Sequence, residues 1–347
     1  MTNINVENCH ELLSWMKEKV KNIVILTHVN PDGDALGSSL GLNCVLKKAG
    51  FNSTVVFPTN FPQIIPGLKD YSNWMIGDYN EKRADKLFSQ ADLIFMLDFN
   101  DLKRLGKIKS KVENLTKMVV LIDHHPQPLI VTPYSFSDTR VSSTAELVYD
   151  FIVKMGWENL IDPQGATALL TGIIADTASF SHNARRPELY KATANLIAHG
   201  ADQYRIQEAL FNTNTEHRLR LLGFALSEKM EIFPDFHTAV IALSGEELKR
   251  YNFKIGDTDG FVNYPLSIKG IIFSCFFMEN EDKIKISFRS KGGFSVNEFS
   301  ASHFSGGGHL NASGGESRKS MREAVKDLVD LLPEYAGKLE EESKKEV

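Results

Sequence analysis

IVILTHVNPDGD, residues 23–34, is the stretch from which the fold of the N-terminal half can be worked out. Its first five residues form an apolar run without alternation, which is typical of a strand covered on both faces of a sheet. A tight loop follows, and we expect a helix from about 35 to 49. In open α/β sheets, ligands bind beyond the carboxyl ends of the strands. The loop therefore places His28, Asp32 and Asp34 where a ligand site is expected.

Similar apolar runs recur along this half of the chain, with helical stretches between most of them. This alternation predicts an α/β fold with a doubly wound, mostly parallel sheet. A helical block follows the last of these runs. The further strands are expected at 53–57, 93–97 and 118–122, and the helices of the block at 144–155, 163–174 and 187–199.

Two more of the expected strands end in residue types that bind metals. Asp98 follows one of them, and Asp123-His124-His125 follows the next. Asp176 ends an apolar helix, where an unpaired carboxylate costs several kcal/mol. A turn or a helix cap explains any one of these residues alone, but three such strand exits together favour a metal site. Imidazole and carboxylate ligands suit manganese, magnesium or cobalt better than a thiolate-binding metal.

The candidate ligands are too numerous for one open catalytic ion, so we predict two metals. Asp98 could bridge the ions, with a water or hydroxide held between them. Ions roughly 3.5–4 Å apart activate such a water and stabilise both the attacking and the leaving oxygen on phosphorus. His125 is left to face a substrate phosphate, and Asp123 could hydrogen-bond a ligating histidine. The candidate ligands are His28, Asp32, Asp34, Asp98, His124 and Asp176.

A second, smaller α/β domain is expected after residue 232, with strands at 237–243, 271–279 and 283–289. Arg289 and Ser290 end the last of these strands, and the arginine could clamp a phosphate. The run Gly306-Gly307-Gly308-His309 could form an anion-binding nest of backbone N–H groups. No lysine follows it as in a P-loop. A solvated arginine and a flexible loop are the alternative interpretations.

The expected boundaries divide the chain into four parts. They are a metal-binding catalytic domain at 1–202, a helical linker at 203–232, a substrate-binding domain at 233–336 and a frayed tail at 337–347. The last helix of the second domain is expected at 318–332.

Composition narrows the possible partners and compartment. Hydrophobic residues make up 42% and charged residues 24% of the chain, as in an ordinary globular protein. A net charge of −5 argues against long duplex nucleic acid, and no apolar stretch is long enough for a membrane span. The N-terminus lacks the pattern of a signal peptide. Three scattered cysteines form no disulfide framework, so we expect a reducing cytoplasm, and a homodimer is a reasonable expectation.

Taken together, these motifs resemble the DHH phosphoesterase superfamily, in the branch with a DHHA1 domain. The first-strand loop, Asp98, Asp123-His124-His125 and Gly172-x-x-x-Asp176-Thr177 match its four motifs in order, and the glycine run matches the DHHA1 signature. The resemblance implies two Mn²⁺ or Mg²⁺ ions, His125 at the scissile phosphate, and Arg104 among the substrate-binding residues. It assigns His28, Asp32 and Asp98 to one ion, Asp34, Asp98, His124 and Asp176 to the other, and Arg289 with residues 306–309 to a terminal phosphate.

Within the superfamily, length and domain content resemble the nanoRNase and 3′-phosphoadenosine-5′-phosphate phosphatase group. Those enzymes degrade short RNA oligomers, so short RNA or DNA oligonucleotides or small nucleotides are the expected substrates. Phosphodiesterases for c-di-AMP or its linear product pApA share this layout and are the main alternative. A family II pyrophosphatase, a RecJ-like exonuclease and a nucleotide-binding regulator without catalysis fit less well.

Overall fold

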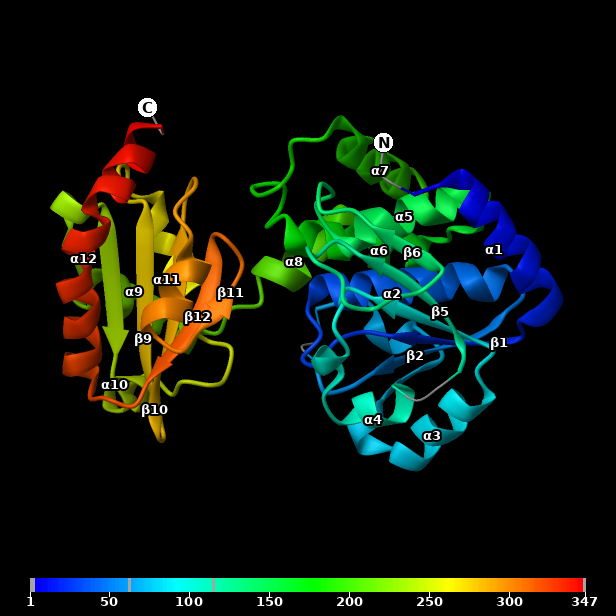
Figure 1. Ribbon diagram of the computed structural model, residues 1–347, viewed down its shortest axis with the longest axis horizontal. Coiled ribbons are helices and arrows are strands. Elements are labelled where there is room, and N and C mark those ends of the chain that lie inside the picture. Colours follow the sequence, from blue (N-terminus) through cyan, green and yellow to red (C-terminus); the bar gives the residue numbers. More distant parts are fainter. Residues whose placement is uncertain (1–3, 62–63, 114–115, 346–347) are drawn as a thin grey trace. The chain divides into compact units, whose positions relative to one another are not determined.

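The computed structural model describes residues 4–61, 64–113 and 116–345. The chain forms two compact units, Met1–Thr213 and Asn214–Val347 (Figure 1). Both units have an α/β fold, as expected from the alternation of strands and helices. No helix in the described part of the chain combines the length and the apolarity that crossing a bilayer requires.

The first unit is built on a six-stranded, fully parallel sheet. The strand order is β3-β2-β1-β4-β5-β6, so the direction of winding reverses between β1 and β4. Such a reversal opens a crevice at the carboxyl ends of the two strands. The strands are β1 (Asn22–Leu26), β2 (Asn52–Phe57), β3 (Trp74–Ile76), β4 (Leu93–Leu97), β5 (Met118–Asp123) and β6 (Tyr134–Ser137).

Helices cover both faces of this sheet, and a separate apolar core lies under each layer (Figure 1). The larger core lies beneath α1, α2, α5 and α6, and the smaller one beneath α3 and α4. The α-helices are α1 (Val6–Lys19), α2 (Gly33–Lys48), α3 (Glu81–Gln90), α4 (Lys109–Val112), α5 (Thr144–Lys154), α6 (Pro163–Asp176), α7 (Pro187–Ala198) and α8 (Gln203–Phe211). Short 3₁₀ helices span Leu68–Asp70, Gly77–Tyr79, Leu102–Ile108 and Glu158–Leu160.

Helices α2 and α6 approach each other closely because glycines line their contact. A Cβ atom on Gly37 of α2 would lie 2.4 Å from the carbonyl oxygen of Ala168 in α6, and one on Gly172 of α6 would lie 3.0 Å from Asp34 Oδ1 in α2. Any side chain at these positions would push the helices apart. The close packing brings the start of α2, with Asp34, next to the end of α6, with Asp176.

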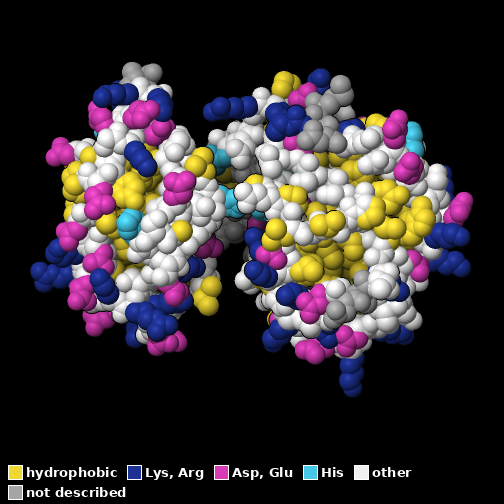
Figure 2. Space-filling model, in the orientation of Figure 1, with side chains coloured by type: hydrophobic (Ala, Val, Ile, Leu, Met, Phe, Trp, Pro, Cys, Tyr) yellow, Lys and Arg dark blue, Asp and Glu magenta, His cyan; other side chains and the backbone are white. Residues whose placement is uncertain are grey.

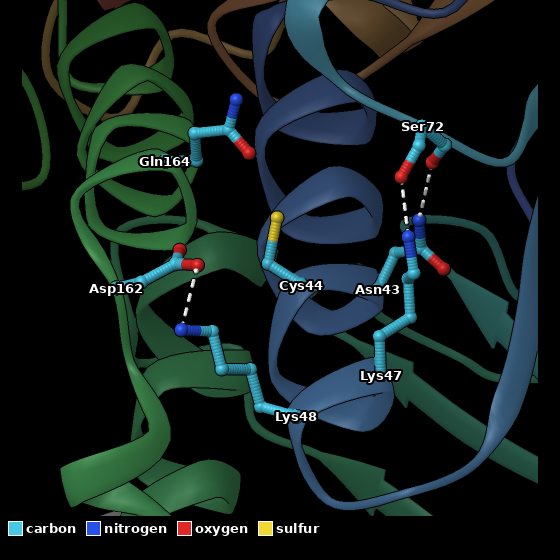
Figure 3. Close-up of a pocket in the computed structure, with 7 residues that line it drawn as sticks. All are labelled: Asn43, Cys44, Lys47, Lys48, Ser72, Asp162 and Gln164. Atoms are coloured by element: carbon cyan, nitrogen blue, oxygen red, sulfur yellow. Dashed lines mark hydrogen bonds and ion pairs between the residues drawn. The ribbon is translucent and has the colours of Figure 1, made fainter.

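A pocket of about 300 Å³ lies near the opposite ends of α2 and α6 (Figure 3). Lys48 pairs with Asp162 there at 3.4 Å, and Lys47 bonds to the Ser72 hydroxyl. Its lining residues are Asn43, Cys44, Lys47, Lys48, Ser72, Asp162 and Gln164. None of them is a predicted site residue, so this pocket is distinct from the predicted metal site.

The second unit contains a mixed six-stranded sheet of order β11-β12-β10-β9-β8-β7, in which only the β8–β9 pair is parallel. One apolar core lies beneath α11 and α12, and another beneath α9 and α10. The strands are β7 (Met230–Phe233), β8 (Thr238–Leu243), β9 (Phe273–Asn280), β10 (Lys283–Ser290), β11 (Gly307–Gly308) and β12 (Ala312–Ser317). The helices are α9 (Glu216–Glu228), α10 (Gly245–Arg250), α11 (Val296–His303) and α12 (Met321–Lys344), with 3₁₀ helices at Pro234–Phe236 and Phe261–Ser267.

The segment 203–232, predicted as a linker, does not stand apart from the two units. Ile206 of α8 is buried in the core of the first unit. Leu221 and Ala225 of α9 are buried in the core of the second. The division falls between them, at residues 213 and 214. The few apolar residues of α8 pack in the core of the first unit, and those of α9 pack in the core of the second. The mostly polar composition of this segment gave no sign of that packing.

The prediction of a frayed tail from residue 337 is wrong up to Lys344, where α12 ends. Pro333 and Gly337 suggest a helix end, but the apolar face of α12 continues past both. Leu339 is completely buried, and the Glu342 carboxylate accepts a hydrogen bond from Gly293 N at 2.7 Å. Packing on the second sheet therefore outweighs the helix-breaking tendency of these residues. Residues 346 and 347 lie outside the described part of the chain.

The surface of both units mixes charges of opposite sign. On the face shown in Figure 2, basic and acidic side chains are intermingled on both units, and on the first unit they lie mainly around a hydrophobic area. This pattern agrees with the net charge of −5.

Candidate metal centre

The loop after β1 positions the first group of candidate ligands. Asp32 caps α2, with its Oδ1 accepting hydrogen bonds from Asp34 N and Ala35 N at 3.0 and 3.1 Å. His28 is nearly buried, and its Nδ1 donates to the Val29 carbonyl at 2.8 Å. This bond orients the ring so that Nε2 faces the carboxylates, 4.0 Å from Asp32 Oδ2. An imidazole held at one nitrogen by a backbone carbonyl is a common metal-ligand arrangement.

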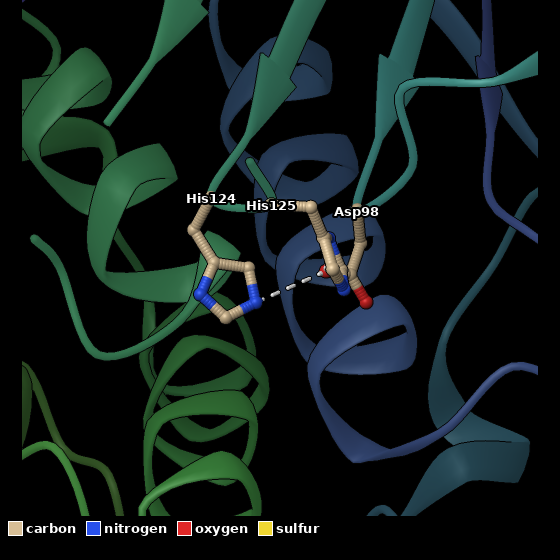
Figure 4. Close-up of side chains that lie close together, drawn as sticks. All are labelled: Asp98, His124 and His125. Carbon is tan, nitrogen blue, oxygen red and sulfur yellow. Dashed lines mark ion pairs between the residues drawn. The ribbon is translucent and has the colours of Figure 1, made fainter. Parts of the chain in front are cut away.

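Asp98 lies at the centre of the cluster, at the end of β4. Its Oδ2 is 3.3 Å from His28 Nε2, whereas its Oδ1 is 3.7 Å from His124 Nε2 and 3.8 Å from His125 Nδ1. Figure 4 shows His124 and His125 converging on this carboxylate. The backbone of Asp98 has a φ of +65°, a left-handed conformation that non-glycine residues seldom adopt. Such strained backbone occurs preferentially at functional sites.

A second group of ligands forms around His124. Its Nε2 lies 3.9 Å from Asp34 Oδ2 and 3.6 Å from Asp176 Oδ2. Asp34 is buried and comes from the first turn of α2, while the partly exposed Asp176 comes from the last turn of α6. The glycine-lined packing of the two helices thus brings together two carboxylates that are far apart in the sequence.

Asp123 is completely buried and supports His125. Its Oδ1 lies 2.7 Å from His125 Nδ1, and its Oδ2 accepts from His125 N at 3.1 Å. Asp123 was expected to support a metal-ligating histidine, but this hydrogen bond goes to the histidine predicted to face the substrate. The reason is local: the turn after β5 folds His125, and not His124, back over the strand end.

The electrostatics of the cluster favour a cation. Burial and the charges of Asp98 and Asp32 raise the pKa of the Asp176 carboxyl to about 8. Burial and the charges of Asp98 and Asp176 raise the pKa of Asp34 well above its ordinary value. Burial also acts to raise the pKa of Asp98, but the hydrogen bond and charge of His28 and the charge of His124 outweigh it, so that pKa is lowered. The cluster therefore retains protons that a divalent ion would displace.

The donor set fits divalent metal ions. Within the described residues, the ion pairs of Asp32, Asp34, Asp98 and Asp176 are all with histidines and not with lysine or arginine. Carboxylate oxygens with imidazole nitrogens are the ligands that manganese and similar ions take. Three sets of side chains have ligand atoms within 4.8 Å of one another, namely His28 with Asp32 and Asp98, Asp98 with His124 and His125, and Asp34 with His124 and Asp176.

Arg104 lies close to this cluster. Its carbonyl accepts a hydrogen bond from Val29 N at 2.8 Å, which ties the loop after β4 to the loop after β1. Its exposed guanidinium is near enough to His125 to oppose protonation of that imidazole. Arg104 thus contributes a positive charge close to the cluster.

In the second unit, Ser290 and the glycine run have structural roles. The buried Ser290 hydroxyl donates to the Phe294 carbonyl and accepts from Asn311 Nδ2 at 2.9 Å. The amides of Gly306, Gly308 and His309 donate to Ser300 O, Asn297 Oδ1 and Ala312 O. These amides are thus engaged within the unit and do not form the predicted anion-binding nest in this conformation.

The glycines are needed because two backbone segments approach closely. A Cβ on Gly306 would lie 2.0 Å from the Gly314 carbonyl oxygen, and one on Gly308 would lie 2.5 Å from that of Ala312. Arg289 pairs with Ala312 across β10 and β12, and its Nη1 donates to the Phe288 carbonyl. The exposed His309 follows β11 directly.

Two residues at the metal centre were not predicted from the sequence. The Thr144 hydroxyl donates to Asp98 Oδ1 at 2.9 Å. The Asn100 side-chain amide donates to the carbonyls of His125 and Pro126 at 3.3 and 3.0 Å, and so holds the loop after β5. Asn100 lies just after β4 and Thr144 begins α5, so both lie at the carboxyl edge of the sheet. Their positions beside expected strand and helix ends are the features of the sequence that could have indicated them.

Comparison with known proteins agrees with this geometry. The model of the DHH family, N-terminal domain, matches residues 22–173, and that of the DHHA1 domain matches residues 238–338. A bifunctional oligoribonuclease and PAP phosphatase, NrnA, of Thermus thermophilus is 31% identical over 293 residues, which cover 84% of this chain and 83% of the relative. The crystal structure of an exopolyphosphatase-related protein from Bacteroides fragilis covers 98% of this chain and 100% of its own, with a TM-score of 0.93 and 39% identity.

A cyclic-di-AMP phosphodiesterase, GdpP, of Geobacillus thermodenitrificans is 26% identical over 92% of this chain, which spans about half (49%) of that relative. The parallel sheet with its carboxylate and histidine cluster, followed by a mixed-sheet unit, defines a phosphoesterase of the two-domain DHH class. The chain belongs to the DHH family, in the branch that carries a DHHA1 domain.

Proposed function

We propose that this protein is a two-metal phosphoesterase that hydrolyses short oligonucleotides to mononucleotides, 3′-phosphoadenosine-5′-phosphate to AMP, or both. The observation that carries the proposal is the convergence of Asp32, Asp34, Asp98 and Asp176 with three histidines at the crevice between β1 and β4. The NrnA relative, a bifunctional oligoribonuclease and PAP phosphatase, supports the substrate class.

The residues divide naturally between two ions. His28, Asp32 and Asp98 would hold one, and Asp34, Asp98, His124 and Asp176 the other, with Mn²⁺ favoured and Mg²⁺ or Co²⁺ as alternatives. When bound, such ions supply the positive charge that activates water and stabilises charge developing on phosphate oxygens. Asp98 serves both groups because its two oxygens face different histidines.

His125 is the side chain we assign to the scissile phosphate. Burial acts to lower its pKa, but the hydrogen bond that it donates to Asp123 and the charge of Asp98 outweigh this effect and raise it. A raised pKa favours the imidazolium form, which donates a hydrogen bond to a phosphate oxygen. Asp123 fixes the ring through Nδ1 and leaves Nε2 for the substrate.

The second unit would bind the nucleotide. Arg289 and His309 are the candidate contacts for its phosphate, together with the exposed backbone of Gly307 and Gly308. Because a guanidinium binds phosphate in a bidentate manner that an ammonium does not reproduce, Arg289→Lys should raise KM about tenfold or more. The kcat should change little, since the chemistry lies in the first unit. A fall in kcat at unchanged KM would contradict this assignment.

The test is to incubate the purified protein with Mn²⁺ and, in parallel, RNA of two to five nucleotides, pApA, c-di-AMP, 3′-phosphoadenosine-5′-phosphate and pyrophosphate. Fastest turnover of the short RNA or of 3′-phosphoadenosine-5′-phosphate is the expected result. Asp98→Ala should reduce hydrolysis more than about 100-fold, because the lost carboxylate contacts both groups of ligands. Asp78→Asn, at an exposed position of the same unit, is the matched control. Undiminished activity of Asp98→Ala would refute the two-metal assignment.

A cyclic dinucleotide is the second candidate substrate, because the similarity to GdpP extends over 92% of the chain. Preferential cleavage of c-di-AMP in the same assay would assign the protein to that reaction. Cleavage of pApA alone would instead place it with the linear dinucleotides.

A further inference from the structure

The first turn of α5 contacts both groups of candidate ligands. Thr144 N donates to Asp34 Oδ2 at 2.6 Å, and Ala145 N donates to Asp34 Oδ1 at 2.8 Å. The Thr144 hydroxyl donates to Asp98 Oδ1 at 2.9 Å. A single residue thus binds two carboxylates through different groups, from a helix that carries none of the predicted ligands.

The orientation of Asp98 depends on such a contact. Asp98 directly follows β4, and its backbone is in the left-handed region that non-glycine residues seldom adopt. Oδ2 faces His28 and Oδ1 faces His124, at 3.3 and 3.7 Å. Rotation of the carboxylate would remove one of these two relationships. The Thr144 hydroxyl bonds to one oxygen and therefore opposes that rotation.

Thr144 is itself held rigidly. It is completely buried, and its β-branched side chain has little rotational freedom. The preceding Ser143 caps α5 by accepting from Glu146 N at 3.0 Å. Glu146 in turn accepts from Ser142 N and pairs with Arg186 at 3.0 Å. The N-terminus of α5 also carries partial positive charge, which favours neighbouring carboxylates.

We infer that Thr144 is a positioning residue of the metal centre, whose hydroxyl fixes Asp98 in the orientation in which one carboxylate serves both ions. The inference rests on the proposed function, because it takes Asp98 as the shared ligand. The Thr144 hydroxyl, and not the volume of the side chain, is required to orient Asp98. The backbone N–H of residue 144 would still hold Asp34 in any variant other than proline.

The test compares Mn²⁺ binding by the wild-type protein and by variants. Electron paramagnetic resonance measures the free ion and detects a spin-coupled pair of bound ions. Thr144→Val keeps the shape and removes the hydroxyl. It should weaken Mn²⁺ binding by about 10- to 100-fold, the usual effect of losing a hydrogen bond to a metal ligand. The spectrum of the coupled ion pair should disappear, and kcat should fall with KM nearly unchanged. Thr144→Ser should stay within about threefold of wild type.

Thr171→Val is the matched control, because this buried threonine of the same unit donates to the Thr167 carbonyl within α6. If Thr144→Val does not fold, Thr144→Ser and Thr144→Ala form a second pair that differs only in the hydroxyl. Wild-type affinity and an intact coupled spectrum in Thr144→Val, or equal behaviour of the Ser and Ala variants, would overturn the inference. A wild-type protein that binds no pair of Mn²⁺ ions would instead overturn the proposed function, and the inference with it.

Discussion

At the scale of single residues, the molecule holds several carboxylates together at short range, and among the described residues their ion pairs are with histidines and not with lysine or arginine. Backbone amides and histidines compensate for part of the repulsion. Asp32 accepts from the first turn of α2, and Asp34 accepts from the first turn of α5. Both turns are helix N-termini, where partial positive charge stabilises an anion. The remaining negative charge is available to a divalent cation.

The pairing of Asp123 with His125 predicts a change in the pH dependence of hydrolysis. Asp123→Asn removes the charge that raises the pKa of His125, so this pKa should fall. Because the proposal requires the protonated imidazole, the high-pH limb of the kcat profile should move to lower pH, and kcat at neutral pH should drop about tenfold or more. Profiles measured with Mn²⁺ on one short RNA test this expectation. An unshifted limb would mean that His125 does not act as the proton-bearing group.

The identities of the clustered residues could be predicted from sequence, whereas their supports could not. Strand exits in a parallel sheet meet at one edge, so Asp98 and His124 were expected beside the first loop. Thr144 and Asn100 act through hydrogen bonds to residues distant in the chain, at separations of 46 and 25 positions. Nothing in the sequence pattern specifies such pairings. The hydrogen-bond partner of Asp123 was assigned wrongly for a local reason, because it depends on how the turn after β5 folds.

At the scale of secondary-structure elements, the packing of α2 on α6 sets the distance between Asp34 and Asp176. Gly37→Ala should therefore be harmful, because the new Cβ would lie 2.4 Å from the Ala168 carbonyl oxygen and 2.6 Å from Gly172 N. Overpacking of this kind costs about 1–3 kcal/mol. We expect Gly37→Ala to lower the free energy of unfolding, measured in urea, and to weaken Mn²⁺ binding.

Gly223→Ala is the control, because a Cβ at this helical position of α9 would meet nothing within 4 Å. Replacing glycine by alanine at such a site should stabilise the protein by up to about 1 kcal/mol. Opposite signs for the two variants are the expected result. Equal effects on stability would show that α2 and α6 have room to separate, so that their packing does not set the site.

Most of the long elements that were predicted lie within a few residues of their observed bounds, whereas α12 runs twelve residues past its predicted end and the shortest strands were missed. The strand at Leu93–Leu97 was predicted with its observed bounds, because a dense apolar run identifies it. The three-residue β3 and the two-residue β11 have too few residues to show a period. The glycines of β11 suggested a phosphate-binding loop, although close approach to β12 accounts for them. That approach depends on the folded sheet and is not visible in the sequence.

At the scale of the whole molecule, metal binding should be linked to pH and to stability. In the metal-free protein the raised pKa of Asp176, about 8, means that this carboxyl is protonated in the folded state at pH values where it is ionised in the unfolded state. Such a group stabilises the fold least at high pH: its contribution is lost as pH rises from near 4 through about 8. A divalent ion replaces the proton, so its affinity rises over the same range.

The increase in Tm on adding Mn²⁺ should therefore be larger at pH 8.5 than at pH 6, relative to protein in EDTA. Because a ligand that binds only the folded state adds RT ln(1 + [L]/Kd), a tenfold gain in affinity adds about 1.4 kcal/mol at saturating Mn²⁺. Asp176→Asn should flatten this pH dependence while leaving a smaller shift from the remaining ligands. We expect the two compact units to give separate transitions in differential scanning calorimetry, and only that of the first should respond, since the clustered ligands all belong to it. An equal response of both transitions, or a Tm shift that is the same at both pH values, would mean that Mn²⁺ stabilises the protein elsewhere than at this cluster.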